Sequence, residues 1–174
     1  MKKSGILIAL LAVLPLMVSF SLFKELEKKI DREIKDEFEV ARYSHEGISI
    51  SDELQKKIPS RISEDNFFRI KNGGELLGYV YLDQAPSKTA DFDYLVIFDK
   101  DLAIARTKVL VYREEYGGEI GSKRWLRQFT GISKASQLDN IAAISGATIS
   151  VRSMKKGVKN ILSSVEILQK NNVL

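Results

Sequence analysis

A run of small and hydroxyl-bearing residues at positions 145–150, with the sequence SGATIS, is the part of this chain best suited to binding chemistry. It directly precedes a helix-forming segment, and the first N–H groups of a helix lack partners and lie at the positive end of its dipole. Small residues let a ligand approach the backbone, and the hydroxyls of Ser145, Thr148 and Ser150 can donate to phosphate oxygens. The run therefore predicts a phosphate site, to which Arg152 adds positive charge.

Two other interpretations of this run stay open. Serine and threonine often precede helices as plain N-caps, without any ligand. A hydrolase with Ser145 as nucleophile is the second, although the Gly-x-Ser-x-Gly pattern is absent and the sequence places no base beside it. The single histidine, His45, lies in a polar run at 43–47 that we interpret as a solvated loop.

The motif at 145–148 resembles the flavinylation motif of the FMN-binding domain family, in which serine or threonine, glycine, alanine and threonine stand in a row. That family includes the small FMN-carrying subunits of the sodium-translocating NADH:quinone reductase and of the Rnf electron-transport complex. The similarity spans roughly residues 76–162 and includes the runs at 112–120 and 125–131. It implies an exported, membrane-anchored domain that carries FMN and transfers electrons.

The resemblance implies a role for each residue of the motif. Thr148 would carry FMN as a phosphoester through its hydroxyl, and Ser145, Gly146 and Ala147 would line the phosphate. Further cofactor contacts are expected from residues beside the motif or in the similar upstream runs, namely Ser150, Arg152, Glu115 and Trp125. We predict no catalytic residue and no metal site, because the isoalloxazine ring itself does the redox chemistry.

One position departs from the family pattern. An aspartate usually stands six residues before the acceptor threonine, where the flavin transferase recognises it, and this chain has Ala142 there. Asp139 is the nearby aspartate, three residues too early. Three alternatives stay open: covalent attachment with Asp139 in that role, FMN bound without a covalent link, and a flavin-free exported binding or scaffold domain with a degenerate FMN-binding fold.

The composition excludes several classes of function. The chain has no cysteine, which rules out disulfides, iron–sulfur clusters, thiolate zinc sites and covalent c-type haem. A single histidine excludes a two-histidine metal site within one chain. The formal net charge of +4 comes from bases interleaved with acids, so we expect no nucleic-acid partner.

An uncharged run from Ser4 to Phe23 follows Lys2 and Lys3 near the N-terminus. Its length is close to the ~20 residues that cross a bilayer as a helix, and leading lysines favour a cytoplasmic N-terminus. We expect a single-pass anchor in a bacterial cytoplasmic membrane, with the C-terminal domain on the periplasmic or extracellular side. Cleavage as a signal peptide is the alternative, but residues 18–23 offer no clean small-x-small cleavage site.

The hydrophobic periodicity predicts the elements that position the motif. A charged segment from residue 24 carries an apolar stripe formed by Leu22, Leu26, Ile30, Ile34 and Phe38. We interpret this segment as a helical stalk lying partly on the domain, with a partner-docking helix as the alternative. A short helix is expected at 51–58, capped by Ser51 or Asp52. Strands are expected in two antiparallel pairs, at 66–71 with 75–82 and at 94–98 with 103–113, separated by a loop at 83–89. Two helices follow, a short one at 122–129 and a long one whose seam is Val151, Met154, Val158, Ile161, Val165 and Leu168.

Together these features predict an α+β fold, in which a twisted antiparallel sheet is packed by the short helix and the C-terminal amphipathic helix. A transmembrane helix and a charged helical connector would precede it, so the expected parts are the anchor at 1–23, the connector at 24–62 and the FMN-binding domain at 63–174. The predicted function is electron transfer rather than stand-alone catalysis. Expected partners are subunits of a membrane redox complex, or another electron donor or acceptor, and a flavin transferase for maturation.

Overall fold

A computed structural model describes residues 24–174, and the expected anchor at 1–23 lies outside this range. Within the described range, no helix combines the length and the apolar character needed to cross a membrane. Residues 24–38 are helical. The elements after them are β1 (Ser44–Gly47), α2 (Asp52–Gln55), β2 (Phe67–Asn72), β3 (Glu75–Pro86), β4 (Asp91–Asp99), β5 (Ile104–Val111), α3 (Lys123–Leu126) and α4 (Thr148–Lys170), with 3-10 helices at Gly118–Gly121, Arg127–Phe129 and Ala135–Asn140.

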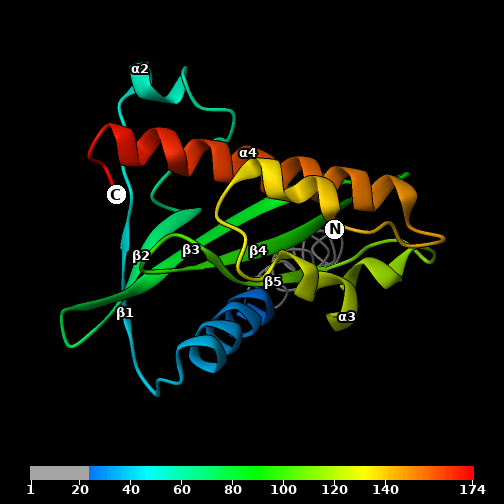
Figure 1. The fold of residues 1–174 in the computed structure, drawn as a ribbon. Coiled ribbons are helices and arrows are strands. Elements are labelled where there is room, and N and C mark those ends of the chain that lie inside the picture. Colours follow the sequence, from blue (N-terminus) through cyan, green and yellow to red (C-terminus); the bar gives the residue numbers. More distant parts are fainter. Residues whose placement is uncertain (1–23) are drawn as a thin grey trace, which may run out of the picture.

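The five strands form one antiparallel sheet in the order β1-β2-β3-β4-β5. Helix 24–38 covers one face of this sheet and α4 covers the other (Figure 1). Strand β4 supplies both cores, because side chains alternate between the faces of a strand: Tyr94 and Val96 lie in the core under α4, whereas Leu95 and Ile97 lie in the core under helix 24–38. The predicted antiparallel sheet and C-terminal helix are confirmed.

The structure corrects several predicted boundaries. The expected loop around His45 is the edge strand β1, which pairs with β2 and places the His45 ring 5.4 Å from that of Phe68. Strand β3 continues to Pro86, where a loop was expected, because Pro86 still pairs with Asp91 of β4. Helix α2 ends at Gln55 rather than residue 58. The expected cap at Ser51 is confirmed by its hydroxyl, which accepts a hydrogen bond from the N–H of Leu54 at 3.3 Å.

Helix 24–38 is packed onto the sheet through its predicted apolar stripe. Ile34 is 1% exposed, and Leu26, Ile30 and Phe38 pack around the same cluster of sheet residues. Full burial of an aliphatic side chain such as that of Ile34 contributes about 1.5–3 kcal/mol. The interpretation of this segment as a helix that lies on the domain is therefore confirmed.

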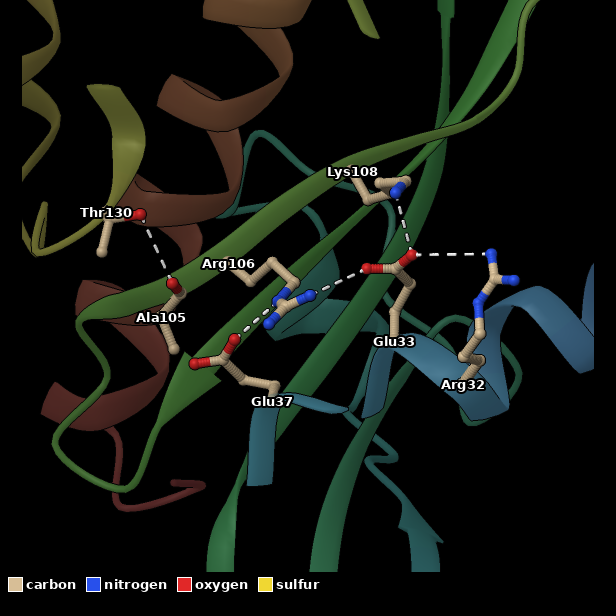
Figure 2. A network of polar contacts seen from close by, with 7 residues as sticks. All are labelled: Arg32, Glu33, Glu37, Ala105, Arg106, Lys108 and Thr130. Carbon is tan, nitrogen blue, oxygen red and sulfur yellow. Dashed lines mark hydrogen bonds and ion pairs between the residues drawn. The ribbon is translucent and has the colours of Figure 1, made fainter. Parts of the chain in front are cut away.

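An ion-pair cluster holds the same helix against β5 (Figure 2). The Glu33 carboxylate lies 2.9 Å from Lys108 Nζ and 3.1 Å from an Arg106 guanidinium nitrogen, and Arg106 also contacts Glu37 at 2.6 Å. Burial alone would raise the pKa of the Glu33 carboxyl. The hydrogen bonds from Lys108 and Arg106 outweigh burial and hold that pKa below its ordinary value.

Replacing Glu33 by glutamine should lower the free energy of unfolding by about 1–3 kcal/mol, because two cations lose their buried counter-charge. Glu27→Gln, an exposed position on the same helix, should change it by less than about 0.5 kcal/mol. Denaturant titrations of both variants measure the difference, and equal losses would contradict a role for the cluster. Because the folded pKa is lowered, the contribution of Glu33 is present above the pKa of the unfolded chain and is lost as the pH falls through the folded value.

The outer edge of the sheet at β5 is covered by other parts of the chain. At its start, Ile104 exchanges backbone hydrogen bonds with the segment after the short helix, donating to the Ile132 carbonyl at 2.9 Å and accepting from Gly131 N–H at 2.7 Å. Further along, the Thr130 hydroxyl donates to the Ala105 carbonyl at 3.4 Å. Near its end, the Leu110 carbonyl accepts a hydrogen bond from the side chain of Lys29 at 3.5 Å.

Candidate functional site

The SGATIS run forms the turn that enters α4. Gly146 has φ of +85°, a left-handed conformation that side chains disfavour, and it turns the chain directly into the helix. Ala147 is the N-cap residue and Thr148 the first helical residue, so the helix begins earlier than its apolar seam predicted. Ala147 is 3% exposed, whereas Ser145, Gly146 and Thr148 are exposed.

No side chain caps the N-terminus of α4. The N-cap side chain is a methyl group, and within residues 24–174 neither the Ser145 nor the Thr148 hydroxyl hydrogen-bonds to the helix. The first N–H groups of α4 therefore stay available at the positive end of its dipole. This geometry argues against the plain N-cap interpretation. It suits an anion whose oxygens accept from these N–H groups beside the exposed Thr148 hydroxyl.

Ser150 points away from the exposed motif and into a cluster of three hydroxyls. Its Oγ lies 2.7 Å from Ser87 Oγ and 3.1 Å from Tyr112 Oη, and these last two atoms are 3.1 Å apart. The Tyr112 hydroxyl also donates to the Tyr116 carbonyl at 2.9 Å. This hydroxyl cluster (Ser87, Tyr112 and Ser150) ties two loops to the start of α4, which places Ser150 in support of the site rather than on its surface.

Tyr112→Phe should lower the free energy of unfolding by about 1–2 kcal/mol, because Ser150 and the Tyr116 carbonyl lose a hydrogen-bond partner. Tyr116→Phe is the matched control, since the side chain of Tyr116 is 82% exposed. The control should change stability by less than about 0.5 kcal/mol. Thermal unfolding of the two variants compares them, and a Tyr112 variant as stable as its control would contradict the role of the cluster.

The loop at 112–117 lies beside the motif. A Cβ added to Gly117 would stand 2.6 Å from the Tyr112 hydroxyl and 3.6 Å from the Gly146 carbonyl oxygen, so the two loops adjoin. The predicted contact Glu115 is exposed on this loop. Tyr116, 82% exposed, and Ile149, 48% exposed, are the large hydrophobic side chains exposed in the described part of the chain. Both flank the motif, Tyr116 on the loop at 112–117 and Ile149 in the first turn of α4.

Trp125 lies in the core rather than on this surface. It is 4% exposed and packs edge-on against Phe129, with ring centroids 5.1 Å apart. Its indole N–H donates to the Ala142 carbonyl at 2.8 Å, and the Gln128 side chain accepts from Ala142 N–H at 2.9 Å. Trp125 thus bears on the motif by fixing the backbone before it. Arg152 is exposed near the start of α4 and forms no ion pair within residues 24–174.

The loop before the motif is held on both sides. Lys155 of α4 donates to the Ile141 carbonyl at 3.2 Å, opposite the contacts of Ala142 with Trp125 and Gln128. Asp139 lies in the preceding 3-10 helix, whose end at Asn140 precedes this fixed backbone. The hydrolase interpretation gains no support, because His45 lies on β1, at the edge of the sheet away from β5.

Comparison with known proteins finds a family model that covers these residues. Residues 89–163 match the family model described as the FMN-binding domain, which confirms the resemblance of the motif. The matched range begins between β3 and β4, ends within α4 and includes the predicted contacts from Glu115 to Arg152. A search of the curated proteins finds no match to this chain. The domain match supports FMN as the cofactor.

Proposed function

We propose that the FMN-binding domain matched at 89–163 makes this chain an electron carrier, which holds FMN by its phosphate at residues 145–148. The observation that carries the proposal is the uncapped start of α4 beside an exposed threonine hydroxyl, at the position where the family motif lies. Bound FMN supplies redox chemistry, and the protein supplies tethering, orientation and tuning.

The residues around the motif fit this cofactor. The N–H groups of the first turn of α4 would donate to phosphate oxygens, and Arg152 would add a positive charge nearby. Tyr116 and Ile149 would give the ring an apolar surface, since both are exposed and flank the motif. Glu115 would reach polar groups of the ring or ribityl chain from the loop at 112–117.

The proposed link is a phosphoester on Thr148. Its hydroxyl is exposed and has no hydrogen bond within the described residues, so attachment would disturb no contact of the fold. Ala142 is the point against a covalent link, because the carboxylate usual at this position is absent. Covalent attachment would then rely on Asp139, from the neighbouring 3-10 helix, or on transferase contacts elsewhere.

The proposed setting is a bacterial cytoplasmic membrane, with the domain on its outer side. It rests on the uncharged run from Ser4 to Phe23, directly before helix 24–38. The partners would be subunits of a membrane redox complex, or another donor and acceptor, and a flavin transferase. A covalent tether would prevent loss of the cofactor where no FMN pool exists.

The test is to purify the full chain after expression with an active flavin transferase. We expect yellow protein with a flavin absorption spectrum. Colour that remains after denaturation and washing would demonstrate the covalent link, whereas colour released by denaturation would demonstrate FMN held without it. Colourless protein would overturn the proposal in favour of a flavin-free binding or scaffold domain, the candidate that Ala142 favours.

A further inference from the structure

Helix 24–38 runs antiparallel to β5. Near the start of the helix, the Lys29 side chain donates to the carbonyl of Leu110, at the end of β5. Further along, Glu33 contacts Arg106 and Lys108 in the middle of that strand (Figure 2). At its end, Phe38 lies against Gly78, which pairs with Asp99 at the far end of the sheet. The chain therefore enters this helix where β5 ends.

The end of β5 is also where the phosphate motif lies. Tyr112 follows directly after Val111, and its hydroxyl is 3.1 Å from Ser150 in the first turn of α4. From Lys29 back to Lys24 the helix rises about 7 Å at ~1.5 Å per residue, and from Leu110 to Tyr112 the strand rises about 7 Å. Lys24 thus reaches the level of Tyr112. We call this the site end of the domain, formed by residues 87–90, residues 112–117 and the start of α4.

The attachment of helix 24–38 leaves it little freedom to swing. Ile34 is 1% and Glu33 is 3% exposed, and the apolar stripe and the ion-pair cluster hold the helix along most of the length of β5. The direction of this helix relative to the sheet is therefore fixed. The point at which the chain enters the domain, Lys24, is then fixed at the site end by this packing.

We propose that the site end faces a lipid bilayer, so that the motif at 145–148 lies on the membrane-facing side of the domain. This rests on the anchoring in the proposed function, because the uncharged run ends at Phe23 and the chain emerges from it at the site end. Tyr116 is exposed at this end, and tyrosine is a side chain that favours the membrane–water interface. A redox partner embedded in or dissolved in the membrane would then reach the cofactor without movement of the domain.

The absence of cysteine allows a direct test with single-cysteine variants. Lys88→Cys lies in the loop between β3 and β4, at the site end, and Lys100→Cys lies in the turn between β4 and β5, at the opposite end. Both lysines are exposed, and β4 separates them by about 26 Å at ~3.3 Å per residue. The full chain, labelled with a donor fluorophore at either cysteine, is reconstituted in phosphatidylcholine–phosphatidylglycerol vesicles that carry an acceptor dye on a fraction of the headgroups.

We expect energy transfer to the headgroups several-fold stronger from position 88 than from position 100. Equal transfer, or stronger transfer from position 100, would overturn the proposed orientation while leaving the flavin function intact. Co-flotation of the unlabelled chain with the vesicles tests the anchor separately. A chain that fails to float would remove the premise of both the membrane setting and the proposed orientation. The flavin spectrum of the same samples reports the proposed function independently of either result.

Discussion

Thr148→Ala should abolish the covalent flavin adduct. Wild-type chain matured with a flavin transferase is expected to gain the mass of FMN minus water on the peptide that contains Thr148. The alanine variant should show none of this gain, because no hydroxyl remains to form the phosphoester. The domain should still fold, since Thr148 is exposed and its side chain caps nothing in α4. Mass spectrometry of the intact chain and of its peptides measures the adduct, and circular dichroism verifies the fold.

Two matched variants make this result specific. Thr148→Ser keeps a hydroxyl at the same position and should keep part of the adduct. Ser145→Ala removes the other exposed hydroxyl of the motif, and it should keep the mass gain on the same peptide. An adduct that persists in Thr148→Ala and disappears in Ser145→Ala would move the attachment site to Ser145.

Gly157→Ala should destabilise the domain by about 1–3 kcal/mol, through overpacking between α4 and the sheet. The same substitution in an exposed helix would stabilise it by up to ~1 kcal/mol. Here the added Cβ would stand 2.3 Å from the Tyr94 hydroxyl and 3.1 Å from the ring carbon that bears it. Tyr94 is 0% exposed and its hydroxyl donates to Asp83 at 3.2 Å, so the ring has no room to withdraw.

The strain has to be relieved by outward movement of α4, because the sheet below Tyr94 is continuous. Denaturant unfolding of Gly157→Ala should show the loss, whereas Lys156→Ala, an exposed neighbour on the same helix, should change stability by less than about 0.5 kcal/mol. A Gly157 variant as stable as wild type would show that α4 adapts at no cost. Since Thr148 lies on the same helix, flavin loading of the two variants also reports whether the displacement reaches the motif.

The sequence predicted the layered fold because its periodicities are strong. The aromatic and β-branched runs of β2 to β5 indicate strands, and the long seam of α4 and the apolar stripe from Leu26 to Phe38 each specify one buried helix face. Strand β1 was missed because Ser44–Gly47 has no apolar alternation. It is held by its backbone pairing and by contacts of Glu46 with Arg69 and Lys71, which depend on a neighbour distant in the sequence.

The site was predicted in part. The motif and its place before α4 follow from the local sequence. The inward direction of Ser150 could also have been predicted, from helix geometry. Two residues along a helix turn through about 200°, so Thr148 and Ser150 face opposite ways. Helical periodicity likewise puts Trp125 on one face with Leu126 and Phe129, so its place in the core could have been predicted. The partners of Glu33, by contrast, lie on β5, and Arg106 stands 73 residues further along the chain. A pattern of alternating charges does not indicate which charged residue becomes buried.

The covered edge at β5 bears on how copies of this chain meet at high concentration. An unprotected edge strand is a template on which another copy can add its own strand, the first step towards aggregates. Here the backbone groups of Ile104 are already taken by Gly131 and Ile132, and the carbonyls of Ala105 and Leu110 accept from side chains. A neighbouring copy that approached either end of this strand would therefore find these backbone groups already occupied.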